Sequence, residues 1–315
     1  MKFGMNFLDS ISQKIIDREL KYEDGVIIGD NSSGKSLLLR MLIAKKGITD
    51  EIYFIDAVNR GFDISKIVEE SRPHEYKKAI LSKRLQEDCF NLKDSFNCYD
   101  TSVERIEEMY DWLGERVQEL FEKLTKERFQ IVPNSILGEV EFKEGRGKLS
   151  SGYQAIVRLL IELLYYQEKC VTEKHLDRAL VIIDELDEFL SPGYAYKIFP
   201  FIKEYFPQME FIVTTHSCDL VAGTQNANLI VLDDLGVEVM DINDYQSVSE
   251  VQIIFDRVFG AHMTRSSKVE EVLRRMLNNK INNAWTEQDQ SKMLQLQYEK
   301  LTASQQLIYR QIMEW

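Results

Sequence analysis

The residues best suited to chemistry lie in one short stretch, "GVIIGDNSSGKSLLLRML", which spans residues 25–42. Gly29, Gly34, Lys35 and Ser36 fit the pattern G-x-x-x-x-G-K-[ST]. Glycines in such a loop let consecutive backbone N–H groups wrap a phosphate, and the helix that follows points its positive N-terminus at the same anion. The pattern predicts an ATP site in which Lys35 reaches the β- and γ-phosphates as a catalytic residue and Ser36 holds Mg2+. The residues expected to contact the nucleotide here are Gly29, Asp30, Asn31, Ser32, Ser33, Gly34, Lys35, Ser36 and Leu37.

A second candidate lies at the end of the apolar run "ALVIIDEL", residues 179–186. The run reads as a buried strand that ends in Asp184 and Glu185, and ligands of parallel sheets bind at the carboxyl ends of strands. We expect Asp184 to hold Mg2+, directly or through water. Glu185 is placed to orient or deprotonate the attacking water, which is a catalytic role. Acidic turns after strands are common, so the pair alone is a weak indication of a metal site. The phosphate loop upstream strengthens this interpretation.

Two further motifs have both a functional and a structural interpretation. In "LSSGYQ", Ser150, Ser151 and Gly152 precede a helical pattern, so they form either a second anion site or a simple N-cap. His216 ends the apolar run "FIVTTHS". Its imidazole is placed to hydrogen-bond a γ-phosphate in a catalytic role, although a single histidine at a strand end is more often structural.

The order of these four motifs resembles that of an ABC-type ATPase head. The continuation "DELDEFLSP" is closer to the D-E-P-E-x-x-L-H-P pattern of the SMC/RecF/OLD-like branch than to the D-E-P-T-S-A-L-D of transporters. Pro192 matches the final proline of that pattern, whereas Leu186 and Ser191 depart from it. Ser151 stands where many signatures have a second glycine, a substitution that OLD-type signatures share.

The resemblance implies that two copies of the chain pair face to face. In that arrangement Ser150, Ser151 and Gly152 would contact the γ-phosphate of ATP bound at Lys35 of a partner chain. The resemblance also makes His216 a switch histidine and places Ser191 and Pro192 in the loop that crosses the interface. Asn59 lies near the position where the family keeps a glutamine that senses Mg2+.

The expected fold is α/β, a P-loop NTPase of the ABC-type ATPase head class with a helical insertion and a helical C-terminal tail. Apolar positions recur every three or four residues from Ile106 to Leu124, which indicates a helix packed on a neighbour. We expect residues 64–129 to be almost wholly helical. The expected strands are 25–30, 51–57, 178–186 and 209–217, followed by a hairpin at 228–242 that turns near "DDLG". The expected domains are 1–63 with 130–245 as the ATPase core, 64–129 as the insertion and 246–315 as the C-terminal region.

Composition and net charge limit the classes of function and the location that the chain can have. The chain has 315 residues and a formal net charge of −13, which opposes a general attraction to nucleic acid. Its four cysteines form no C-x-x-C pair, which argues against a disulfide framework and a zinc site. No apolar run is long enough to span a membrane, and the first residues do not read as a signal peptide. We therefore expect a cytoplasmic protein without membrane contact.

The leading hypothesis is a compact ATPase whose ATP-dependent dimerisation senses or gates a separate effector, such as a nuclease or toxin. This organisation resembles the ATPase subunits of bacterial anti-phage defence systems. The tail offers no strand-borne Asp-x-Asp, so we expect no TOPRIM nuclease on this chain. The alternative is a DNA-binding recombination or repair clamp of the RecF/SMC type, whose basic residues would lie at 263–268 and 274–275 or on the insertion. A small-molecule kinase would leave "LSSGYQ" and His216 unexplained.

Overall fold

The computed structural model describes most of the chain. The described residues are 5–67, 79–87, 89–93, 105–132, 137–233, 236–245 and 247–259, with scattered positions between 273 and 313. The chain divides into two compact units, Met1–Val251 and Gln252–Trp315. Within the second unit a small apolar cluster is formed by Leu273, Met276, Met293 and Ile312, with Trp285 and Tyr309 packed against it. The basic stretches 263–268 and 274–275 lie outside the described residues.

The first unit is built on a six-stranded sheet in the order β2-β6-β7-β1-β8-β9. All neighbouring pairs are parallel except β8 with β9, which form an antiparallel hairpin. The carboxyl ends of the parallel strands therefore meet at one edge. The strands are β1 (Gly25–Gly29), β2 (Ile52–Ile55), β6 (Ala179–Ile183), β7 (Met209–Thr214), β8 (Asn228–Asp233) and β9 (Gly236–Asp241). These bounds confirm the expected strands and the hairpin.

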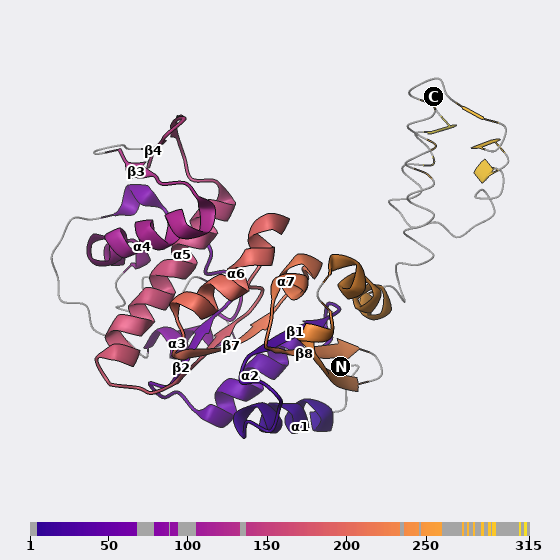
Figure 1. Ribbon diagram of the computed structural model, residues 1–315, viewed down its shortest axis with the longest axis horizontal. Helices are drawn as coiled ribbons and strands as arrows, with labels where there is room; N and C mark the ends of the chain where they lie inside the picture. Colours follow the sequence, from indigo (N-terminus) through magenta and orange to yellow (C-terminus); the bar gives the residue numbers. More distant parts are fainter. Residues whose placement is uncertain are drawn as a thin grey trace. The chain divides into compact units, whose positions relative to one another are not determined.

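Helices cover both faces of this sheet (Figure 1). On one face, α2 (Lys35–Lys46) buries Leu38 and Leu42 in a core cluster with alternate strand residues such as Phe54 and Ile182. On the other face, Tyr53 stacks on Tyr166 of α5 (Ser151–Tyr166), with ring centroids 4.8 Å apart. α6 (Pro192–Tyr205) lies on this second face too, since Phe199 packs edge-on against Phe211. The alternation of side chains along β2 and β7 thus fixes which helix lies on which face.

The first helix, α1 (Met5–Ile16), is an element that the sequence analysis did not assign. Leu8 and Ile11 are buried in the same core cluster as α2, while Asp9 remains exposed. Asp9 interrupts the apolar run in the sequence but falls on the outer face of the helix. The helical spacing of the apolar residues in α1 can therefore be recognised only when the buried face of the helix is known.

Where the structure describes it, the segment 64–129 is less helical than expected. The helices of these described parts are η1 (Ile64–Lys66), α3 (Ala79–Arg84), η2 (Ile106–Glu108) and α4 (Met109–Thr125). Residues 85–87 and 89–93 form turns instead, so the expectation of an almost wholly helical segment is wrong there. Asn91 has a left-handed φ of 52°, and its side chain accepts a hydrogen bond from the backbone of Ala57, 3.0 Å away. A tertiary contact therefore overrides the local helical pattern.

The apolar periodicity in α4 is confirmed as a packing face. Met109, Leu113, Val117 and Phe121 are buried, and α4 packs against α5. A small antiparallel sheet precedes α5, and short elements follow α5, β7 and β9. They are β3 (Gln130–Ile131), β4 (Val140–Phe142), β5 (Gly145–Gly147), η3 (Gln167–Thr172), α7 (Cys218–Gly223) and η4 (Ile242–Asp244). Residues 248–259 are helical.

Candidate functional site

The phosphate loop connects β1 to α2 at the carboxyl edge of the sheet. Gly34 has a φ of 101°, in the left-handed region that a side chain disfavours, so glycine is required where the loop turns into the helix. Lys45 and Lys46 lie in the last turn of α2, where their positive charges interact favourably with the negative end of the helix dipole. The positive end of the dipole is the N-terminus of α2, which lies at the loop. The predicted loop residues Gly29 to Leu37 are thus brought together as one strand–turn–helix unit.

Lys35 is the buried cation of this loop. Its Nζ donates to the carbonyl oxygens of Gly29 at 2.8 Å and Asp30 at 3.3 Å. Burial lowers the Lys35 pKa, and the carboxylates of Asp184, Glu185 and Asp30 oppose that shift. A phosphate group would offer the ammonium stronger acceptors than two neutral carbonyls do.

Two further observations test whether the loop fits ATP and Mg2+. Ser33 is buried in the loop, and among the described residues its hydroxyl has no hydrogen-bond partner. The Ser36 hydroxyl lies 3.1 Å from Oδ2 of Asp184 and donates to it, so a hydroxyl and a carboxylate already converge. Mg2+ prefers such hard oxygen ligands together with phosphate oxygens. The residues present therefore fit Mg·ATP, with Ser36 and Asp184 as the protein side that would hold the metal.

Asp184 is held from several directions at the end of β6. It is 2% exposed. Its Oδ1 accepts from the Thr214 hydroxyl at 2.5 Å, and its Oδ2 accepts from Asn91 Nδ2 at 2.9 Å as well as from Ser36. Three donors shared between its two oxygens fix the orientation of the carboxylate. The predicted metal-holding acid is therefore oriented before any ligand binds.

Glu185 follows in an unusual backbone conformation. Its φ is 54°, which is left-handed for a residue with a Cβ. Its backbone N–H donates to the Thr214 hydroxyl at 2.7 Å, which helps to hold this conformation. Burial raises the Glu185 pKa, and the negative charges of Asp184 and Glu188 raise it further. A carboxyl group with a raised pKa is a stronger base once it is deprotonated.

We expect the Glu188→Gln substitution to move the acid limb of the kcat–pH profile for ATP hydrolysis to lower pH. The base acts deprotonated, so hydrolysis falls as pH falls through the Glu185 pKa. Removing the Glu188 charge lowers that pKa, because this charge raises it. Steady-state kinetics across the acid range would measure the limb, with Glu115→Gln on the exposed side of α4 as the control. An unchanged limb in Glu188→Gln would contradict the assignment of Glu185 as the base.

The start of α5 carries the predicted second anion motif. The Ser150 hydroxyl accepts from the Tyr153 backbone at 3.2 Å, so the N-cap interpretation is correct for this serine. Ser150 and Ser151 are exposed. A Cβ on Gly152 would lie 2.9 Å from the Phe189 carbonyl oxygen, so glycine permits close packing of the helix start on the segment after β6. The cap role does not exclude a ligand role, which stays a prediction.

His216 follows β7 at the same edge of the sheet. Burial lowers the His216 pKa, and the positive charge of Lys35 lowers it further, while Asp187 and Asp30 act in the opposite direction. These charge interactions place His216 near the phosphate loop. A neutral imidazole at this position suits a hydrogen bond to a phosphate oxygen, and its catalytic role stays a prediction.

Two polar residues of the site were not foreseen as such. Thr214 bridges Asp184 and the Glu185 backbone, and its only signal in the sequence was its place at the end of "FIVTTHS". Asn91 reaches Asp184 from a separate segment. Asn59, by contrast, was named in the sequence analysis; it is buried and bonds to Asp56 and Arg158, and its suggested place near a Mg2+-sensing position stays a prediction.

We expect Asn91→Ala to lower the Mg2+ concentration that gives half-maximal ATP hydrolysis. Asn91 donates to the same Asp184 oxygen as Ser36, so metal binding at that oxygen requires the Asn91 side chain to move or turn. Titrating Mg2+ at fixed ATP would measure the half-saturating concentration, which should fall severalfold. Asn226→Ala, at an exposed position, is the control. Identical Mg2+ titrations for Asn91→Ala and wild type would contradict a role at the metal.

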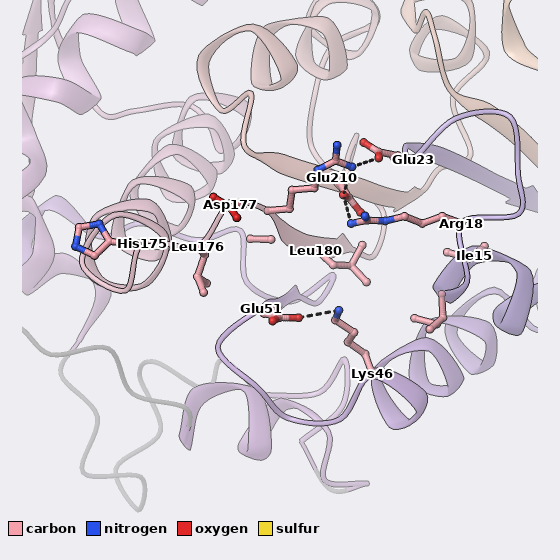
Figure 2. Close-up of a pocket in the computed structure, with 13 residues that line it drawn as sticks. Ile15, Arg18, Glu23, Lys46, Glu51, His175, Leu176, Asp177, Leu180 and Glu210 are labelled. Atoms are coloured by element: carbon pink, nitrogen blue, oxygen red, sulfur yellow. Dashed lines mark hydrogen bonds and ion pairs between the residues drawn. The ribbon is translucent and has the colours of Figure 1, made fainter.

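A second hollow lies at the opposite edge of the sheet and has a volume of about 700 Å³. Figure 2 shows that its basic side chains point toward acids: Arg18 pairs with Glu210 at 2.6 Å and Lys46 with Glu51 at 2.8 Å. Arg178 pairs with Glu23 and lies 3.5 Å from Glu210. Since its cations are already paired, this hollow is a poor site for a triphosphate.

The structure contains no helix, within the described ranges, that is long and apolar enough to cross a membrane. The described residues also hold no group of three or more histidine, cysteine or acidic side chains placed to bind a metal ion. The expected metal site differs from such a cluster, because it combines one carboxylate, one hydroxyl and phosphate oxygens.

The phosphate loop, the strand-end acid pair and a second helix start are all carried by a largely parallel sheet in an α/β fold, as the motif order predicts. No family model matches the chain. The chain is similar to the Septu protein PtuA of Bacillus thuringiensis, with 27% identity over 165 residues that cover 49% of this chain and 40% of that protein. It is 32% identical over 85 residues to the Septu protein PtuA of Bacillus mycoides strain KBAB4, covering 27% and 12% respectively. The chain thus spans less than half the length of these curated relatives.

Two solved structures show the range of structural similarity. The SMC head domain from Thermotoga maritima has a TM-score of 0.32 and 16% identity, covering 43% of this chain and 49% of that one. An inward-facing putative metal-chelate type ABC transporter has a TM-score of 0.36 and 16% identity, covering 76% and 79%.

Proposed function

We propose that the chain is an ATP-binding and ATP-hydrolysing head whose ATP-dependent pairing gates a separate effector in anti-phage defence. The observation that carries the ATPase part is the convergence of Ser36 on Asp184 beside Lys35, at the edge of the sheet where ligands bind. The partial similarity to two Septu PtuA proteins supports the defence part.

In the proposed hydrolysis, Glu185 is the base. A water oxygen forms a bond to the γ-phosphorus, the bond from that phosphorus to the bridging oxygen breaks, and ADP leaves. The water proton passes to Glu185. Mg2+ would neutralise phosphate charge when bound, Lys35 would bind the β- and γ-oxygens, and His216 would hydrogen-bond the γ-phosphate.

Pairing is proposed because one copy leaves the start of α5 exposed. Ser150 and Ser151 lie on the surface, at a helix N-terminus whose dipole favours an anion. A second copy would bring its bound γ-phosphate to this surface, and each nucleotide would then be held by two chains. Bound ATP would stabilise the pair, and hydrolysis of ATP would limit the lifetime of the pair.

The test is a mass measurement of the purified protein with and without Mg·ATP. We expect a mass close to one chain without nucleotide, and twice that mass or a higher multiple with Mg·ATP. Purification from the native host would additionally recover a bound effector protein. A mass that does not change with ATP would overturn the pairing proposal, and recovery of the chain alone under every nucleotide condition would count against the effector.

We expect Ser150→Arg to block pairing while ATP binding persists. A long cation at the start of α5 would clash with the partner chain and fill the anion site, and ATP binds at a loop on another element. Ser150→Ala is the matched control, because it removes the N-cap, at a cost of about 1 kcal/mol, without adding bulk. Light scattering with Mg·ATP would report pairing and equilibrium dialysis would report binding. If Ser150→Arg pairs as well as Ser150→Ala, the start of α5 is not at the interface.

A further inference from the structure

A short segment after β2, Asn59–Gly61, contacts the backbone of the acid pair. Arg60 is 3% exposed, and its Nη2 donates to the carbonyl oxygens of Asp184 at 2.8 Å and Glu185 at 3.1 Å. Its Nη1 donates to the carbonyl of Asn59 at 3.1 Å. A guanidinium has a fixed planar fork of donors, so these bonds set the relative position of the segment and the acid pair.

The other side of the same segment is bound to α5. Arg158 donates through Nη2 to Oδ1 of Asn59 at 2.9 Å and through Nη1 to the carbonyl of Gly61 at 3.3 Å. Arg158 lies on the helix whose start is Ser150–Gly152. Three consecutive residues therefore connect the helix of the second anion motif with the backbone of the proposed base.

The α5 end of this connection is rigid. Glu162 accepts from Arg158 Nε at 2.8 Å, from Arg84 Nη2 at 2.8 and 2.9 Å, and from the Tyr53 hydroxyl at 2.9 Å. All four side chains are fully buried. Buried charges are stable only with their hydrogen bonds complete, so Arg158 has little freedom to move except together with α5.

The acid-pair end, by contrast, has room to move. A cavity of about 500 Å³ is lined by residues from three places in the chain, among them Arg60, Gly61, Ser151 and Glu185. Glu185 there adopts the left-handed φ of 54°, a conformation that persists only when its surroundings hold it. Arg60 and Thr214 supply the bonds that hold it.

We propose that Arg60 is a positioning residue that couples α5 to Glu185, so that engagement of the α5 start by a partner chain orients the base. This proposal rests on the proposed ATP hydrolysis. A displacement of α5 moves Arg158, Arg158 moves the Asn59–Gly61 segment, and Arg60 moves the carbonyl of Glu185. Hydrolysis is then efficient only in the paired state, which prevents unpaired heads from consuming ATP.

The experiment compares Arg60→Lys with wild type in ATP affinity, pairing and turnover. Lysine keeps the charge but cannot bond both carbonyls in a fixed geometry, so kcat should fall about tenfold or more while KM stays within about threefold. The Mg·ATP-induced pair should also live longer by a similar factor, because hydrolysis ends it. Arg178→Lys is the matched control: it replaces an exposed arginine that precedes the same strand, β6, at the opposite edge of the sheet.

A second variant keeps the test decisive if Arg60→Lys is poorly folded. Arg60 lines an open cavity, so Arg60→Ala leaves a space that guanidinium ions can enter. Millimolar guanidinium should restore kcat in Arg60→Ala and should not raise it in wild type, which a purely structural loss would not show. Unchanged kcat and pair lifetime in Arg60→Lys, or no rescue of Arg60→Ala, would overturn the coupling role. If wild type itself neither pairs nor hydrolyses ATP, the proposed function has failed instead.

Discussion

We expect Lys35→Ala to abolish ATP binding at millimolar nucleotide. The Lys35 ammonium is the buried cation of the phosphate loop, and within the described part of the chain it donates to the carbonyls of Gly29 and Asp30. Charge-assisted bonds to two phosphates would contribute about 3 kcal/mol or more, which is about a hundredfold or more in affinity. Equilibrium dialysis or calorimetry with ATP would measure the loss.

The same substitution has a second consequence that needs no nucleotide. The positive charge of Lys35 lowers the His216 pKa, so its removal should raise that pKa toward the usual range. A nuclear magnetic resonance titration of the imidazole would follow it. Lys46→Ala is the control for both measurements, since Lys46 lies at the far end of the same helix and pairs with Glu51 (Figure 2). Wild-type ATP affinity in Lys35→Ala would remove the basis for the nucleotide site.

Glu185→Gln should bind ATP normally, hydrolyse it at least about a hundredfold more slowly and accumulate as the ATP-bound pair. Glutamine keeps the size of the side chain and the backbone bonds to Arg60 and Thr214 but cannot accept the proton of the attacking water. Glutamine carries no negative charge, so the substitution also removes the repulsion between residue 185 and Asp184. We therefore expect the variant to fold as wild type does. Single-turnover hydrolysis and mass measurement would report both effects.

Glu173→Gln is the control for this variant, because Glu173 is exposed and, within the described ranges, forms a local ion pair with Lys169. It should hydrolyse ATP and release the pair as wild type does. Hydrolysis at the wild-type rate in Glu185→Gln would show that another group is the base. Loss of ATP binding in Glu185→Gln would show that the carboxylate has a structural role instead.

The sequence by itself determined the features that are local. The phosphate loop is a contiguous pattern, and the acid pair is recognised by the five apolar residues that precede it, so both were located with their neighbouring strand and helix. The strands followed from short apolar runs, and α4 followed from its three- and four-residue spacing. These signals are local because backbone geometry and burial act over a few residues.

Only the tertiary structure decided which polar groups surround the acid pair. Asn91 lies 93 residues before its partner Asp184, and Arg60 lies 124 residues before it. No periodicity links residues so far apart, and Asn91 lies in a segment that reads as helix but forms a turn. The strand order, with β7 between β1 and β6, places Thr214 beside Asp184 and is likewise invisible in the motifs. Such pairings depend on how the elements pack, because a buried polar group takes its hydrogen-bond partner from whichever element lies beside it.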